Sequence, residues 1–144
     1  MKAQLQAAMK DAMRAKDKAK LDTIRGILAA IQYEEMEKEV EPLPESVILE
    51  VLQREIKKRR EEIEFAEKAN RVEAVATLNA DIQTIEAFLP RQLSVDEIST
   101  IVTELRAADP ALNMGGVMKV LKEKFSGQYD GRVASDLVKK MFAS

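Results

Sequence analysis

The sequence of 144 residues contains no cysteine and no histidine. Without cysteine the chain can form no disulfide, no thiol nucleophile and no thiolate metal site. Without histidine it lacks the commonest general base and the commonest zinc ligand. A di-iron carboxylate bundle, which needs Glu-x-x-His pairs, is excluded for the same reason. From these absences we expect no catalytic residues, no metal and no cofactor.

Aromatic residues and glycine are also scarce. Tryptophan is absent, and the chain has 2 tyrosines, 4 phenylalanines and 5 glycines, so alanine, leucine, isoleucine, valine and methionine must build the core. These residues favour helices. Hydrophobic residues make up 46% and charged residues 33%, which is typical of a globular chain rather than a disordered one. The length is sufficient for one domain or two small ones.

Long apolar runs and a strong charge of either sign are missing as well. The net charge of −2 argues against bulk electrostatic capture of nucleic acid or of an anionic membrane. No apolar stretch has the length of a spanning helix, and the N-terminal MKAQLQAAMKDAM lacks the apolar centre of a signal peptide. We therefore predict a soluble, cytoplasmic protein with no membrane partner.

Apolar residues recur three and four positions apart, which is the spacing of helices that pack through one face. In the first part of the chain, Asp17 is the expected N-cap of the second helix and Asn70-Arg71 the corner before the fourth. The second helix should pack through Leu21, Ile24, Leu28 and Ile31. Helices are expected over residues 2–16, from 18 to the turn EPLPE, over about 45–69 and over about 72–89.

Pro90 ends this region, and LPRQLSVDE is typical of a linker. Ser94 and Glu97 form a capping box, and Asn113 and Asp130 can cap two further helices. We predict an all-α fold with an N-terminal bundle of about four helices, residues 1–89, and a small C-terminal three-helix domain, residues 94–144. The expected core positions of that domain are Ile98, Ile101, Val102, Leu105, Val117, Leu121, Phe125, Val133, Leu137, Val138 and Met141.

Four consecutive cations, KKRR at residues 57–60, are the most conspicuous charge feature. Successive helical residues lie about 100° apart, so these cations surround the helix rather than form a patch. Carboxylates lie four residues before or after them, which favours a solvated helix surface over a phosphate clamp. Arg59 is the exception, because it shares a stripe with Ile56 and Ile63. We expect Arg59 to be more buried than Lys57, Lys58 and Arg60 and to pair with a carboxylate.

Four segments in this order and spacing resemble the YqeY family across essentially the whole chain. They are KDKAKLDTIRGILAAIQYEEMEK, EVLQREIKKRREEIE, IEAFLPRQLSVDE and GGVMKVLKEKFSGQYDGRVASDLVKK. The resemblance implies an all-helical protein with a longer N-terminal bundle and a small C-terminal three-helix domain. That domain is similar to the tail domain of GatB, a subunit of the tRNA-dependent amidotransferase, where it contacts tRNA.

The family often carries the label of a carbon–nitrogen ligase with glutamine as amido-N-donor. In the amidotransferase this chemistry belongs to an amidase with a Ser-Ser-Lys triad and to the catalytic cradle of GatB. This sequence has neither a Gly/Ser-rich amidase stretch nor a nucleotide-binding glycine loop. The resemblance therefore implies a non-catalytic accessory module that binds tRNA, and the ligase label applies by association. The alternative is a protein-interaction adaptor with no RNA role, whose partner is a protein.

Only the cations of the GatB-like region could contact phosphate. Six cations and three carboxylates lie between Lys119 and the C-terminus. Helical spacing places Lys119 and Lys122 opposite Val117 and Leu121, and it places Arg132 and Lys139 on a shared polar face. Asp136 could instead neutralise Arg132 and Lys139 locally. The candidate nucleic-acid contacts are Lys119, Lys122, Lys124, Arg132 and Lys139. Tyr129 could stack on an exposed base or be part of the core.

Overall fold

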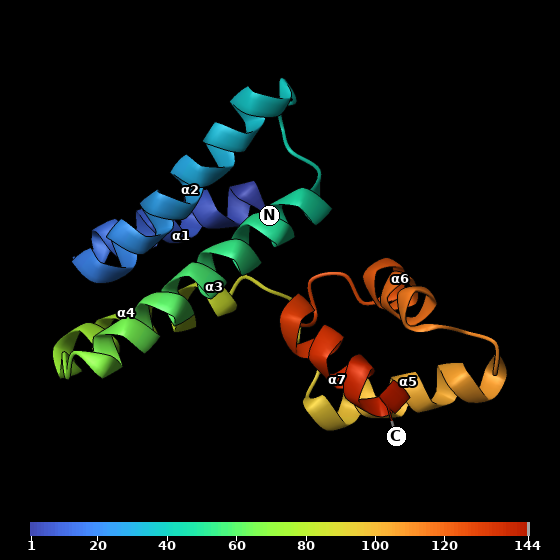
Figure 1. Ribbon diagram of the computed structural model, residues 1–144. Helices are drawn as coiled ribbons and strands as arrows, with labels where there is room; N and C mark the ends of the chain where they lie inside the picture. Colours follow the sequence, from blue (N-terminus) through green and yellow to red (C-terminus); the bar gives the residue numbers. More distant parts are fainter. Residues whose placement is uncertain (144) are drawn as a thin grey trace. The chain divides into compact units, whose positions relative to one another are not determined.

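A computed structural model describes residues 1–143, and within them all regular structure is α-helical. The predicted all-α fold is therefore confirmed. Figure 1 shows the helices in chain order. They are α1 (Lys2–Arg14), α2 (Lys18–Lys38), α3 (Glu45–Lys68), α4 (Val72–Glu86), α5 (Val95–Ala108), α6 (Met114–Lys124) and α7 (Gly131–Ala143).

Contacts along the chain define two compact units, Met1–Leu89 and Pro90–Ser144. We call them the N-terminal unit, which contains α1 to α4, and the C-terminal unit, which contains α5 to α7. Each unit has a hydrophobic core of its own.

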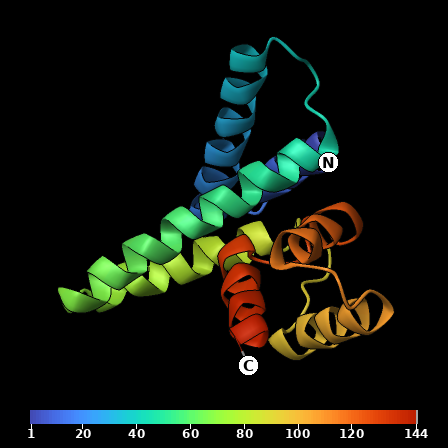
Figure 2. The same cartoon turned by 45° about the vertical axis from the view of Figure 1, so that its right-hand side comes forward.

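In the N-terminal unit α1 packs on α2, α3 packs along α4, and α2 also contacts both α3 and α4. The buried residues of this core are Leu5, Ile27, Ile31, Leu43, Ile48, Val51, Leu52, Ile56, Ile82 and Ile85. In α3 they come from the first half of the helix, and in α4 they come from the second half. Figures 1 and 2 show the other halves, which meet at the corner between α3 and α4, extending beyond α1 and α2.

The helix boundaries follow the predicted capping residues. The Asp17 side chain accepts a hydrogen bond from the Lys20 backbone N–H at the start of α2. Asn70 adopts a left-handed φ of 55°, a conformation that asparagine tolerates, and so makes the corner between α3 and α4. At α5 the Ser94–Glu97 capping box is complete, and at α6 Asn113 accepts from the Gly116 N–H. These caps explain why the helices begin where the sequence predicts.

The C-terminal unit packs α7 against both α5 and α6. Its buried residues are Ile98, Val102, Val117, Leu121, Ala134 and Val138. The expected core position Val133 is wrong, because Val133 is 43% exposed and Ala134 is fully buried. The small side chain of Ala134 lets α7 approach its neighbours closely, and it lies four residues before Val138 on the same face. Before α5, the Leu93 N–H and the Gln92 side chain donate to the carbonyl groups of Gln128 and Gly127.

Among residues 1–143 no helix combines the length and the apolar character needed to cross a bilayer. The longest, α3, carries charged side chains along its length.

We expect residues 90–144 to fold as an isolated fragment, because this segment has a closed core and its own helix caps. The fragment should be helical by circular dichroism and should melt in one cooperative transition. Dispersed methyl signals in the NMR spectrum would show that the core is packed. A helical fragment without a cooperative transition would mean that the C-terminal unit depends on the rest of the chain.

Candidate nucleic-acid interface and a polar groove

On α6 the apolar face contains Val117 and Leu121, both fully buried. Lys119 and Lys122 lie about 60° apart around the helix axis, on the side away from those two residues. Both lysines are exposed. The local sequence thus places one face of α6 in the core and two cations on the opposite face.

On α7 the buried positions are Ala134 and Val138. Arg132 and Lys139 are exposed and, being seven residues apart, lie on nearly the same side of the helix. The Asp130 side chain accepts from the backbone N–H groups of Arg132 and Val133, which fixes the start of α7 and with it the position of Arg132.

The structure does not bring all five predicted cations onto one face. Lys124 is exposed, but it lies almost opposite Lys119 and Lys122 around α6. Within residues 1–143, none of the five candidate side chains forms an ion pair, and Asp136 pairs with neither Arg132 nor Lys139. We call Lys119, Lys122, Arg132 and Lys139, the exposed cations on the polar sides of α6 and α7, the cationic face. Its phosphate-binding role stays a prediction.

Tyr129 is partly buried and packs against the C-terminal core. Burial raises the pKa of its phenol above the ordinary value. Since the ring is engaged in the core, Tyr129 is a poor candidate for stacking on a base.

At the start of α5, Arg91 forms a bidentate pair with Glu97, with nitrogen–oxygen distances of 3.1 and 2.6 Å. The hydrogen bond from Arg91, followed by the one from the Ser94 N–H, lowers the pKa of Glu97 to about 2. Glu97 therefore stays ionised at neutral pH and completes the capping box. This pair is part of the helix cap.

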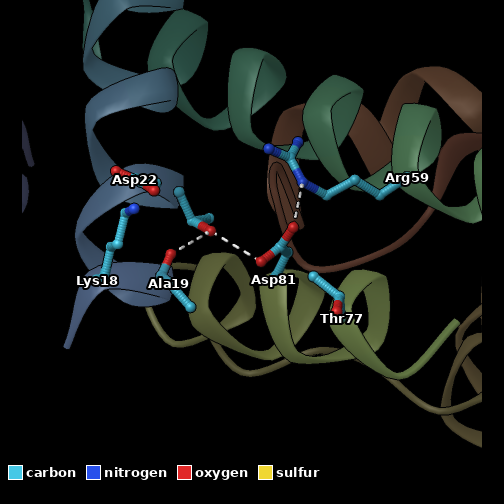
Figure 3. Close-up of a pocket in the computed structure, with 7 residues that line it drawn as sticks. Lys18, Ala19, Asp22, Arg59, Thr77 and Asp81 are labelled. Atoms are coloured by element: carbon cyan, nitrogen blue, oxygen red, sulfur yellow. Dashed lines mark hydrogen bonds and ion pairs between the residues drawn. The ribbon is translucent and has the colours of Figure 1, made fainter. Parts of the chain in front are cut away.

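A second polar cluster lies in the N-terminal unit, where α2, α3 and α4 meet (Figure 3). Arg59 Nη1 donates to Glu55 Oε1 at 3.3 Å, and Arg59 Nε lies 3.8 Å from Asp81 Oδ2. The Thr23 hydroxyl donates to Asp81 Oδ1 at 2.9 Å. The Arg59 side chain is 16% exposed, whereas that of Arg60 is 48% exposed and Lys57 and Lys58 are exposed. The predicted burial and pairing of Arg59 are confirmed.

These groups border a groove of about 550 Å³ lined by Lys18, Ala19, Asp22, Thr23, Arg59, Thr77 and Asp81. The charges of the lining residues are two cations and two carboxylates, which gives the groove no preference for one sign of ligand. The contacts of Arg59 and Thr23 all lie within the protein and connect three helices. We interpret this cluster as a structural bridge, and we call the connection Thr23–Asp81–Arg59–Glu55 the polar bridge.

Sequence reasoning identified Arg59 but not its partner Asp81, nor Thr23. Thr23 lies four residues before Ile27 and eight before Ile31, so it is a polar residue on the buried stripe of α2. That interruption is a signal that could have been found, because a buried hydroxyl needs a partner. Among the described residues, no group of three or more carboxylates gathers in a way that could hold a metal ion.

A family model and one curated relative match nearly the full length of this chain. The family model described as Yqey-like protein matches residues 2–142. The altered inheritance of mitochondria protein 41, mitochondrial, of Lachancea thermotolerans is 28% identical over 143 residues, which are 95% of this chain and 76% of that protein. An uncharacterised protein of Schizosaccharomyces pombe is 30% identical over 95 residues, 65% of this chain and 76% of its own length. The altered inheritance of mitochondria protein 41, mitochondrial, of Eremothecium gossypii is 32% identical over 87 residues, which are 60% of this chain and 48% of that protein.

These names correct one prediction. The expected cytoplasmic location is wrong by this comparison, because the similar proteins of Lachancea thermotolerans, Eremothecium gossypii and Kluyveromyces lactis are all named as mitochondrial. Hydropathy and net charge determine how a chain interacts with water and with charged surfaces, and these interactions are the same in every aqueous compartment. They therefore carry no information about which compartment a protein occupies.

Proposed function

Because the chain belongs to the YqeY family, we propose that it is a non-catalytic accessory module that binds tRNA through α6 and α7. The names of its relatives give no reaction, and the proposal contains no catalytic step. The tRNA part of the proposal rests on the similarity of the C-terminal unit to the tail domain of GatB.

The cationic face is the observation that carries the proposal. Lys119, Lys122, Arg132 and Lys139 are exposed and form no ion pair among the described residues. Residues 119–144 have a net charge of +3, in a chain whose total is −2. A locally basic surface on an acidic protein attracts a polyanion to one place rather than to the whole molecule.

Binding of this kind is governed by counterion release. Each phosphate that a cation neutralises releases condensed counterions, so affinity falls steeply as salt rises. Four contacts from single lysine and arginine side chains should give modest affinity and little base specificity, since phosphate contacts carry no sequence information. RNA shape, and not base sequence, would then distinguish tRNA from a duplex.

We expect the variant Lys119→Ala/Lys122→Ala/Arg132→Ala/Lys139→Ala to lose most tRNA affinity at low salt. Each lost phosphate contact should reduce the slope of log affinity against log salt by about 0.7–0.9, hence by about 3 for all four. Filter binding or fluorescence anisotropy with tRNA and with an RNA duplex of matched length measures both quantities. Circular dichroism verifies that helicity is unchanged.

A matched control is Lys10→Ala/Arg25→Ala/Lys57→Ala/Lys58→Ala. It removes an equal number of cations, three lysines and one arginine, from exposed positions of the N-terminal unit, so it changes the net charge equally. It should keep the parent affinity and slope. If the cationic-face variant binds like the parent, this face is not the site. If the parent itself does not bind tRNA at low salt, the module hypothesis fails and the adaptor alternative replaces it.

The adaptor alternative is supported by a separate observation in the N-terminal unit. The halves of α3 and α4 that extend beyond α1 and α2 expose large apolar side chains, among them Phe65 and Val72. A protein partner could bind there whether or not the C-terminal unit binds RNA.

A further inference from the structure

Residues 61–78, the end of α3, the corner and the start of α4, form a two-helix projection that we call the distal arm (Figures 1 and 2). Two helices packed only on each other cannot cover the apolar surface that both present. Ala66 is the one buried residue of the arm, and the other buried residues of α3 and α4 all lie outside it. The other apolar residues of the arm are only partly buried or are exposed.

Two large side chains of the arm are exposed to an unusual degree. Phe65 is 72% exposed and Val72 is 78% exposed. A single exposed apolar residue is ordinary, but Phe65 borders a groove of about 430 Å³ on the same arm. The groove is lined by Glu62, Phe65, Ala66, Ala69, Arg71, Ala74 and Leu78. An aromatic side chain beside a concave apolar surface is typical of the centre of a protein interface.

The groove is shaped by small residues. Ala66 and Ala69 of the α3 end face Ala74 and Leu78 of α4, and the three alanines leave room that larger side chains would fill. A space of this volume accepts a few large apolar side chains. The apolar face of an amphipathic helix presents side chains of this kind.

The distal arm as a whole is acidic, although the lining of the groove itself holds one carboxylate, Glu62, and one cation, Arg71. Residues 61–78 contain five carboxylates and two cations, a net charge of −3. One of those cations, Lys68, lies 6.0 Å from the centre of the Phe65 ring. A partner that reaches the groove must therefore approach a negatively charged arm, which favours positive charge on that partner.

We propose that the distal arm docks a basic amphipathic helix of a partner protein. Large apolar residues on one face of that helix would enter the groove beside Phe65, and its lysines or arginines would meet Glu62 of the lining and the other carboxylates of the arm. Charge decides against the other occupants. A second copy would bring two acidic arms together, and an anionic membrane surface would repel the arm. This inference is independent of tRNA binding by the C-terminal unit.

A synthetic 18-residue peptide provides a defined probe for the test. The basic peptide carries leucines at helical spacing on one face and lysines and arginines on the flanks, and the acidic peptide has glutamates at every cationic position. Titration of the full chain by calorimetry gives the affinity, and amide shifts in NMR spectra give the location. We expect the basic peptide to bind, with shift changes concentrated in residues 61–78, and the acidic peptide to bind at least about tenfold more weakly.

Two variants separate the apolar and the charged parts of the site. Phe65→Ala/Val72→Ala should weaken binding of the basic peptide at least about tenfold without lowering the melting temperature, because both side chains are exposed. Glu62→Lys/Glu73→Lys should weaken the basic peptide and strengthen the acidic one. The matched control Tyr33→Ala/Val95→Ala removes an aromatic and a valine that are 63% and 53% exposed elsewhere, and it should bind like the parent.

Each other result would overturn the proposal. The arm is not a docking site if the basic peptide does not bind at millimolar concentration, or if its shift changes lie outside residues 61–78. Equal binding of the two peptides would remove the charge argument. If the full chain dimerises in analytical ultracentrifugation and Phe65→Ala/Val72→Ala makes it monomeric, the occupant is a second copy rather than a partner helix.

Discussion

Replacing Leu52 by alanine is expected to lower the free energy of unfolding of the N-terminal unit by about 2–5 kcal/mol. Leu52 has no exposed surface and lies in the core cluster formed by α1, α2, α3 and α4. Truncation removes the transfer free energy of the lost methyl groups and leaves a cavity, because packed helices relax only partly. Since domains of this size are stable by only about 5–15 kcal/mol, the loss is a large part of the total. Urea denaturation followed by circular dichroism measures it.

The matched control for this variant is Val72→Ala, at a position of α4 that is 78% exposed. It should change the free energy of unfolding by no more than about 0.5 kcal/mol. NMR signals of the C-terminal unit provide a second check. They should persist in Leu52→Ala at urea concentrations where signals of the N-terminal unit have disappeared. Equal stability of Leu52→Ala and the parent would show that α3 does not supply the centre of this core.

The fold was predictable from local features that act within one or two helical turns. Asp17, Ser94 and Asn113 accept the hydrogen bonds expected of N-caps. Asn70 makes the corner between α3 and α4, as expected. Such features depend on a few neighbouring residues, so a single sequence contains the information.

The residues that face the core were less predictable, because they depend on which helices meet. On α2 the stripe Leu21, Ile24, Leu28 and Ile31 was expected, but Ile27 and Thr23 are buried while Leu21 and Leu28 are only partly buried. Two adjacent stripes of α2 are both apolar, and contact with α3 and α4 decides between them. On α7 the same ambiguity led to the prediction of Val133 as a core residue, whereas Ala134 is the buried one.

The candidate site was predictable as a set of exposed cations on two helices. Spacing alone gives the directions of Lys119, Lys122, Arg132 and Lys139 on their own helices. It cannot show that α6 and α7 pack against each other, which places the two pairs in one small unit. The groove of the distal arm was not predicted at all, because it depends on how two helices leave a space between small side chains.

The polar bridge and the distal arm are parts of the same two helices. Arg59 and Asp81 join α3 and α4 close to where these helices leave the main core, and the arm begins at the next turn of α3. A charged link at that place holds the register of two helices beyond the reach of the apolar core. We therefore expect the bridge to govern how firmly the base of the arm is held.

Arg59→Ala is expected to lower the free energy of unfolding of the N-terminal unit by about 1.5–3 kcal/mol. The substitution leaves the Glu55 and Asp81 carboxylates, whose side chains are 17% and 20% exposed, without their cation. Partly buried charges that lose their partner keep most of their desolvation cost, although some water can reach these two. Urea denaturation gives the difference, and amide hydrogen exchange in residues 61–78 should become faster as the arm loosens.

The neighbouring substitution Lys58→Ala is the control, since Lys58 is exposed and forms no ion pair among the described residues. It should stay within about 0.5 kcal/mol of the parent. A double-mutant cycle with Asp81→Asn isolates the pair, and residues in one such network couple by about 0.5–3 kcal/mol. If the effects of Arg59→Ala and Asp81→Asn simply add, the 3.8 Å approach of their side chains contributes nothing, and packing of the Arg59 stem would have to account for its burial.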